Sequence, residues 1–221
     1  MTESKEFNLD VLQALQEVTL GTNHVERWQG TPQMFPYNVS THAYNCAMLY
    51  MQLCSVCRKK LNERLLGALL CHDNMESLTG DLLAPAKDSA EDSWDSIEEQ
   101  VQEKWRKDHN IPAVTTRTFL PVEEDYLSNL DREGRLLLKI IDMAEFLFHA
   151  QQEYKAGNRC SKVMDGLKYG GASLRHKIHA VKNACAIVPS SHADIVDIVA
   201  CIKYYYNRQC SNLSLSDDYY V

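Results

Sequence analysis

The chain has 221 residues and a mass of 25.2 kDa, a size that suits one large domain spanning residues 1–221. Apolar residues make up 45% of it and charged residues 24%, which excludes a disordered or fibrous protein. The net charge of −7 argues against binding of a nucleic-acid polymer, because such surfaces depend on basic residues that meet phosphates. A small anionic substrate needs only a few cations in a pocket, so it remains possible.

The N-terminal segment MTESKEFNLD predicts a cytoplasmic protein. It is polar and acidic and has no apolar stretch after a basic one, so it resembles neither a secretory nor a transit signal. Every apolar run falls short of the ~18 residues that a membrane span needs. The eight cysteines are scattered through apolar segments, as is typical of reduced core thiols. Cys54 and Cys57 form a CxxC pair, but they lie inside a helical pattern and have no second pair to complete a zinc site.

Apolar residues recur three and four positions apart through most of the chain, which predicts an all-α bundle without a sheet. The first helix is expected at residues 9–20. An irregular segment rich in glycine and proline follows at residues 21–40. Ser40 is expected to cap the next helix, which runs to about residue 59, and a third helix begins near residue 62.

The next predicted element is a charged surface helix to about residue 107, which Asp88 and Glu91 open as a capping box. An apolar segment at residues 136–150 marks a helix through the middle of the domain, with Gly157 just after its end. The other elements expected here are a loop at residues 108–121, an acidic helix from 122 toward 135, and helices at 174–186 and 191–207. The domain then has a motif-bearing core at residues 8–160 and C-terminal helices at 161–210.

Asp142 places a carboxylate in the middle of this apolar helix. A buried carboxylate is costly unless a cation compensates its charge, so something positive should lie beside it. From the helix alone, a salt bridge to arginine or lysine and a bound metal ion are equally good interpretations.

His72 and Asp73 follow the apolar run RLLGALLC, so a nitrogen and an oxygen ligand project from one turn of a buried helix. Glu76 lies four residues after His72 on the same face, where its carboxylate could reach a water molecule on a metal ion. A His-Asp pair alone says little. Its combination with His42, near the start of an earlier helix, and with Asp142 indicates a metal site.

The order H…HD…D is the metal signature of HD-domain proteins, and further segments resemble the bacterial 5′-deoxynucleotidase family. They are ERW (26–28), NVSTH (38–42), HDNMESLTGDLLAPAK (72–87) and LKIIDMAEFLFHAQQEYKAGN (138–158). The likeness covers roughly the first 160 residues in order and spacing. It implies a compact, helical HD-domain bundle that forms a homodimer or a larger homo-oligomer.

The resemblance implies that the metal ligands are His42, His72, Asp73 and Asp142. Two imidazoles and two carboxylates suit Co²⁺, Mn²⁺, Zn²⁺ or Fe²⁺, and they leave positions open for water and phosphate.

The resemblance also implies roles around the metal, with Glu76 as general acid or base and Asp81 orienting the sugar or an attacking water. Arg27 and Lys87 would hold phosphate, and Trp28 would pack against the deoxyribose where a 2′-hydroxyl does not fit. Lys139, one turn before the acidic ligand of the central helix, is a further phosphate candidate.

Structural interpretations stay open for several of these residues. Trp28 could plug the core from its loop, Asp81 could cap a turn, and Lys87 could be a solvated surface lysine. His149, on the central helix, is expected to be a packed core histidine rather than a ligand.

Three functions are therefore compatible with these motifs. The first is removal of the 5′-phosphate from deoxynucleoside monophosphates. The second is hydrolysis of a deoxynucleoside triphosphate to nucleoside and triphosphate, since the motifs are also similar to those of phage enzymes that destroy dATP. The third is a catalytically silent HD protein that only binds a nucleotide, although all four ligand positions and Glu76 are present here.

Overall fold

The structure is a computed structural model that describes residues 9–81, 92–109, 111, 124–187 and 193–221. Within these residues it is helical and contains no strand, and one isolated β-bridge joins Glu26 to Asn38. The all-α prediction is thus confirmed. Among the helices of this part of the chain, none is long and apolar enough to cross a membrane.

The described elements follow one another as short and long helices. In chain order they are α1 (Leu9–Gly21), η1 (Thr22–His24), α2 (Val39–Cys57), α3 (Glu63–Cys71), α4 (Glu76–Thr79), α6 (Asp92–Asp108), the π-helical turn η2 (Glu124–Ser128), α8 (Arg132–Lys155), α9 (Ser161–Ile187), α10 (Ala193–Asn212) and η3 (Asp217–Tyr219).

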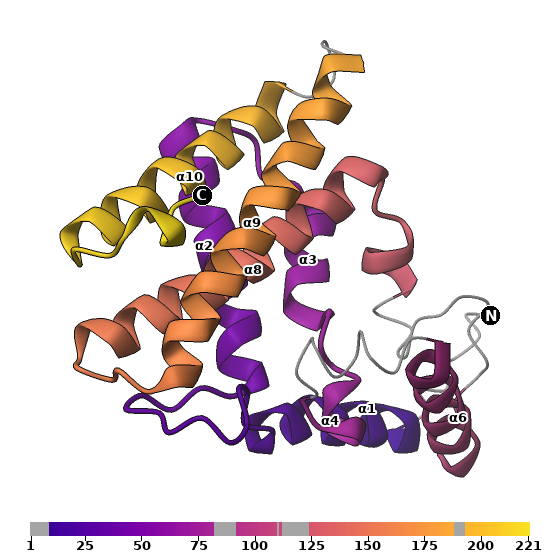
Figure 1. The fold of residues 1–221 in the computed structure, drawn as a ribbon. Helices are drawn as coiled ribbons and strands as arrows, with labels where there is room; N and C mark the ends of the chain where they lie inside the picture. Colours follow the sequence, from indigo (N-terminus) through magenta and orange to yellow (C-terminus); the bar gives the residue numbers. More distant parts are fainter. Residues whose placement is uncertain (1–8, 82–91, 110, 112–123, 188–192) are drawn as a thin grey trace.

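Helix α8 passes through the middle of the bundle and contacts α2, α3, α9 and α10, as Figure 1 shows. Its apolar side chains are buried around much of its circumference, with Ile140, Ile141 and Leu147 fully inaccessible. Burial of each such side chain contributes about 1.5–3 kcal/mol, so this helix supports much of the core. The expected central helix is confirmed, and Gly157 follows its end with a left-handed φ of +105°.

Helix α9 begins at Ser161, so the prediction of a helix starting at residue 174 was wrong. Each glycine disfavours a helix by about 1 kcal/mol, so the glycines in the first half of α9 masked the helical pattern in the sequence. The structure shows why they are there. A Cβ atom at Gly166 would lie 2.7 Å from Trp28 Cζ2, and one at Gly170 would lie 2.8 Å from Leu147 Cδ2. Close packing onto α8 and Trp28 therefore outweighs the low propensity.

Asn38, and not Ser40, caps helix α2. The Asn38 side chain accepts hydrogen bonds from the Thr41 backbone N–H and the Ser40 hydroxyl, both at 2.8 Å, which places Ser40 inside the helix. The expected start of α3 is confirmed, because Asn62 caps it through the backbone N–H groups of Arg64 and Leu65.

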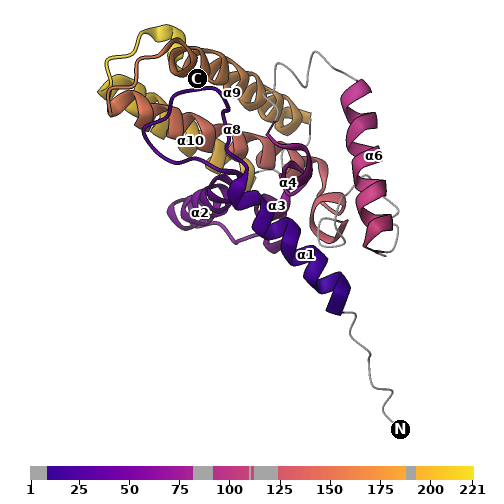
Figure 2. The ribbon, with the colours of Figure 1, turned by 90° about the horizontal axis from the view of Figure 1, so that it is seen from below.

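The acidic helix expected from residue 122 toward 135 is divided. The described part has the π-helical turn η2, and α8 begins separately at Arg132. Asp131 interrupts the helix because its side chain accepts a hydrogen bond from the Gly134 N–H at 2.7 Å and so caps α8. The proposed capping box of Asp88 and Glu91 lies outside the described residues. Helix α6, which follows it, lies at one side of the molecule, apart from α9 and α10 (Figure 2).

Candidate metal and substrate site

The four predicted metal ligands come together from three helical segments. His42 lies near the start of α2, His72 and Asp73 directly follow α3, and Asp142 lies in the middle of α8. His42 Nε2 is 3.1 Å from Asp142 Oδ1 and 3.7 Å from Asp73 Oδ2. His72 Nε2 is 3.4 Å from Asp73 Oδ2 and 3.9 Å from Asp142 Oδ1. The Nε2 atoms of the two histidines therefore both face the carboxylates of Asp73 and Asp142.

His72 presents a ring nitrogen that suits a metal ion. Its Nδ1 lies 3.0 Å from the backbone oxygen of Leu69, so Nδ1 carries the proton and Nε2 keeps its lone pair. His72 Nε2 is buried and has no hydrogen-bond partner. A buried polar atom without a partner is costly, and a cation among these side chains would satisfy it.

The charges around the cluster also fit a cation. Four carboxylates, of Asp73, Glu76, Asp142 and Glu145, gather near one arginine and two histidines. Burial raises the pKa of Asp73, but His72 and Arg27 outweigh it and lower that pKa to about 2. Burial likewise raises the pKa of Asp142, and its contacts with the two histidines hold it well below the usual range. Both carboxylates are therefore ionised at neutral pH.

Burial and the charge of Arg27 lower the pKa of the His42 imidazole. The contacts of the ring with Cys46 and Asp142 raise that pKa, and their effect prevails. The groups around the His42 ring therefore favour a positive charge at this position, which again fits a bound cation.

Cys46 lies beside the same histidines, one helical turn after His42. The sulfur is 3.6 Å from His42 Nε2 and 3.7 Å from Nδ1, and the donor atoms of His42, Cys46 and His72 lie close enough together to hold a metal ion. Burial raises the pKa of the Cys46 thiol to about 12, so the group is protonated at neutral pH and is a poor ligand as it stands. Because the sulfur is almost equally far from both ring nitrogens, it lines up with the lone pair of neither.

Glu145 is a site residue that the sequence analysis missed. One carboxylate oxygen, Oε2, lies 2.5 Å from His42 Nδ1 and accepts a hydrogen bond from the Tyr37 hydroxyl, also at 2.5 Å. The other oxygen, Oε1, accepts from Asn45 Nδ2 at 3.0 Å. Its position three residues after Asp142 puts it on the same face of α8, and this spacing was the available signal.

Arg27 lies at the cluster together with Glu76. Its Nη1 donates to Asp73 Oδ2 and lies 3.4 Å from Glu76 Oε2. Glu76 is 5% exposed at the start of α4, so its carboxylate faces the protein interior. The structure thus brings the predicted phosphate-binding arginine and the predicted acid or base to the edge of the ligand set.

Trp28 has an unusual backbone and a buried ring. Its φ of +61° is rare for a large side chain, and its N–H donates to Asp81 Oδ2 at 2.8 Å. The ring is 7% exposed and packs edge-on against Phe146, with the centroids 5.1 Å apart. The tryptophan therefore has the core-filling role that the sequence left open. A contact between this ring and the sugar stays a prediction.

The remaining predicted residues lie elsewhere. Lys87 is outside the described residues. Lys139 is exposed, and no ion pair joins it to the described members of the cluster. His149 is a buried core histidine, as expected, and stacks on Tyr37 with the ring centroids 3.8 Å apart.

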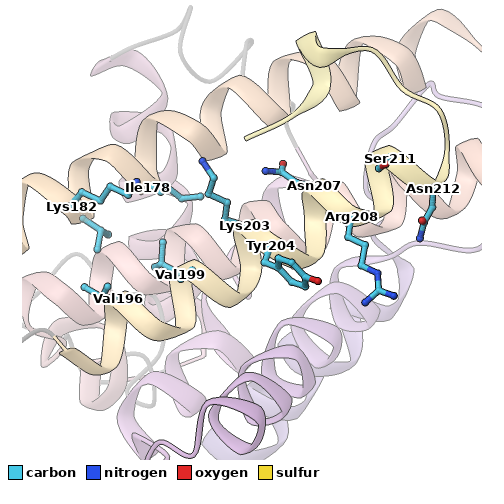
Figure 3. Close-up of a pocket in the computed structure, with 12 residues that line it drawn as sticks. Ile178, Lys182, Val196, Val199, Lys203, Tyr204, Asn207, Arg208, Ser211 and Asn212 are labelled. Atoms are coloured by element: carbon cyan, nitrogen blue, oxygen red, sulfur yellow. The ribbon is translucent and has the colours of Figure 1, made fainter.

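A surface groove of about 550 Å³ between α9 and α10 contains none of the predicted site residues (Figure 3). Val199 and Ile178 line it together with Lys203 and Tyr204. The candidate chemistry therefore lies in the interior cluster and not in this groove.

The comparison with protein families matches residues 17–182 to the family described as 5′-deoxynucleotidase YfbR-like. This match covers every predicted site residue. No curated protein matches the chain by sequence.

Solved structures share the fold at low sequence identity. The HD phosphohydrolase DatZ of cyanophage S-2L, bound to dA and one catalytic Zn²⁺ ion, has a TM-score of 0.58 and 16% identity, over 88% of this chain and 95% of DatZ. An HD-domain phosphohydrolase from Listeria innocua has a TM-score of 0.57 and 16% identity, over 92% of this chain and 98% of its own. A conserved hypothetical protein from Pyrococcus furiosus has a TM-score of 0.53 and 15% identity, over 87% and 99%. The likeness identifies the architecture as the helical HD-domain bundle.

Proposed function

Because the chain belongs to the YfbR-like 5′-deoxynucleotidase family of HD-domain phosphohydrolases, we propose that it removes the 5′-phosphate from 2′-deoxynucleoside monophosphates. One observation carries this proposal. The cluster of His42, His72, Asp73 and Asp142 holds a buried imidazole nitrogen without a hydrogen-bond partner, and Arg27 lies at its edge. A cation would satisfy the nitrogen, and the arginine would then lie where a substrate phosphate could meet both.

The metal ion of the proposal is one of Co²⁺, Mn²⁺, Zn²⁺ and Fe²⁺, since these suit mixed imidazole and carboxylate ligands. When bound, such an ion polarises a phosphoryl oxygen and lowers the pKa of a coordinated water. Zinc has support from DatZ, whose structure contains a catalytic Zn²⁺ ion. The thiol of Cys46 is an alternative ligand because it belongs to the histidine group that could hold a metal.

The protein side chains would then supply the other catalytic and positioning roles. Arg27 donates hydrogen bonds to the phosphate and neutralises part of its charge. Glu76 takes a proton from the attacking water or gives one to the leaving 5′-oxygen. Asp81 acts through Trp28, because its carboxylate holds the backbone N–H of that residue in the left-handed conformation.

Selection of the deoxyribose is assigned to Trp28. Its ring is clamped between α8 and α9, where Phe146 and Gly166 leave it little room to move. A rigid ring edge excludes an additional hydroxyl better than a mobile one, since the ring would have to shift to admit it. That DatZ is bound to dA supports a deoxynucleoside as the ligand.

A deoxynucleoside triphosphate is the second candidate substrate, because dA is the part that both kinds of substrate share. The charge of the described part of the site favours the monophosphate. Among the described residues, Arg27 is the cation that contacts the cluster, whereas Lys139 is exposed and not paired with it. A triphosphate brings more negative charge and would be expected to need more cations.

Ion chromatography of the products tests the proposal. The metal-loaded protein is incubated with dAMP, with dATP and with the matching ribonucleotides. Release of free phosphate from dAMP is the expected result. Triphosphate from dATP would instead select the second candidate, and no turnover of any substrate with nucleotide still bound would select the catalytically silent protein. Sedimentation in the same buffer tests the expected homodimer or larger assembly.

A further inference from the structure

We infer that Glu145 is a positioning residue that fixes the orientation of His42 for metal binding, although it is not a metal ligand itself. The inference rests on the proposed function, because it needs a metal ion at His42. It concerns a network of buried side chains that joins α8 to the loop before α2.

The two nitrogens of the His42 ring face different groups. Nε2 faces Asp142 and Asp73, the predicted ligands, at 3.1 and 3.7 Å. Nδ1 faces Glu145 Oε2 at 2.5 Å. A carboxylate accepts hydrogen bonds and cannot donate them, so Nδ1 must carry the proton. In the neutral form of the ring, which metal ligation requires, the lone pair is then on Nε2, on the side of the other ligands.

Glu145 is itself held in one position. Tyr37 donates to the oxygen that contacts His42, and Asn45 donates to the other oxygen. The Glu145 side chain is 7% exposed and Tyr37 is 3% exposed, so water has little access to the hydrogen bond between these two residues. Tyr37 in turn stacks on His149, which fixes the plane of the phenol.

The same geometry excludes Glu145 from the ligand set. Its two oxygens are used by His42, Tyr37 and Asn45, and the contact with His42 is on the ring nitrogen opposite to Asp142. Metal-ligating histidines commonly donate their second N–H to a carboxylate in this way, and loss of that partner weakens metal affinity by about 10–100-fold. His72 uses a backbone oxygen, that of Leu69, for the same purpose.

The test compares the 221-residue chain with its Glu145→Gln variant. A glutamine keeps the size of the side chain, but its amide can donate to Nδ1, which would move the proton of the neutral ring to Nε2. We expect Zn²⁺ affinity, measured by competition with a chromophoric chelator, to fall about 10–100-fold. Excess Zn²⁺ should restore much of the lost phosphatase activity, since the acid or base and the phosphate contact are unchanged.

Glu153→Gln is the matched control. It replaces another buried carboxylate on α8, one that accepts from the backbone of Met34 and Phe35 and from Asn158. Its Zn²⁺ affinity should stay within about threefold of wild type while its stability falls. Equal affinity in Glu145→Gln and wild type would overturn the inference and leave the proposed function standing.

A second measurement needs no variant and so does not depend on the folding of Glu145→Gln. In the Zn²⁺-loaded wild type, ¹⁵N NMR of the histidine rings should show the His42 proton on Nδ1, with the ring assigned by through-bond correlation to the backbone of His42. A proton on Nε2 would overturn the inference. Wild-type protein that binds no divalent metal in the chelator assay would overturn the proposed function instead, which keeps the two failures distinct.

Discussion

The guanidinium of Arg27 donates a hydrogen bond to the carboxylate of Asp73. This contact joins the predicted phosphate-binding residue to a predicted metal ligand. A phosphate bound at the metal would therefore also be within reach of the arginine, with no large movement of the backbone. The interaction makes Asp73 the residue whose removal should disturb the site most directly.

Asp73→Ala should remove both bound metal and activity while helical content stays near wild type. Its carboxylate contacts Arg27, His42 and His72 rather than the apolar core, so the helices should form without it. Metal content by mass spectrometry, circular dichroism and phosphate release check this result. Asp194→Ala, which removes an exposed carboxylate paired with Lys59, is the control and should keep metal and activity. An active variant of Asp73 without metal would contradict the site assignment.

Glu76→Ala should keep its metal and lose about 10²–10⁴-fold in kcat, the range expected when a general acid or base is removed. Its carboxylate lies at the edge of the cluster, where Glu76 Oε2 is 3.4 Å from Arg27 Nη1. Metal content and steady-state kinetics are measured together. Glu76→Gln, which keeps the side chain's size but cannot exchange the proton, should show the same loss. If either variant lost its metal, Glu76 would have to be counted as a ligand.

Trp28→Ala should narrow the preference for deoxynucleotides over ribonucleotides. Since the ring is largely buried, the variant should also lose about 3–5 kcal/mol of stability, so assays belong well below its unfolding temperature. The informative quantity is the ratio of kcat/KM for dAMP and AMP in each protein. Trp94→Ala on α6 is the control and should leave the ratio unchanged. A common decrease for both sugars in Trp28→Ala would leave the tryptophan with a structural role alone.

Cys46→Ala should retain metal binding. The thiol is protonated at neutral pH and does not line up with the lone pairs of His42, so we expect the carboxylates to complete the ligand set. Replacement with Co²⁺ offers a direct readout, because a thiolate ligand produces a charge-transfer absorption in the near ultraviolet. Wild type should lack this band. Its presence in wild type, with loss in Cys46→Ala, would make the cysteine a ligand.

Glu153 should make the stability of the protein depend on pH. Burial raises its pKa, but the hydrogen bonds from Asn158, Met34 and Phe35 outweigh burial and lower it. A lowered pKa in the folded state stabilises the protein above the unfolded value of about 4.3, and that contribution is lost as pH falls through the folded pKa. Glu153→Gln should therefore be less stable than wild type at pH 7, and the difference should shrink below about pH 4.

Denaturant midpoints of wild type and Glu153→Gln at pH 7 and at pH 3.5 measure this difference. Glu17→Gln, which changes an exposed carboxylate on α1, is the control for general charge effects. A difference that is the same at both pH values would show that the glutamate contributes through packing rather than through its charge.

The amino-acid sequence alone determined the helical fold and the predicted ligand set. The repeat of apolar residues and the capping residues are both recognised within a few positions along the chain, so most helices could be located from the local sequence pattern. The candidate ligands could be named because each falls in a short motif, such as His72-Asp73 after an apolar helix. Their gathering into one cluster agrees with the spacing of those motifs.

Only the tertiary structure decided the partners of these residues. The contact of Glu145 with His42 joins positions 103 apart, and that of Tyr37 with Glu145 joins positions 108 apart. No local period encodes such pairs. The first half of α9 and the burial of Trp28 depend on each other for the same reason. Gly166 is a poor helix former, but a side chain at this position would collide with the buried indole ring.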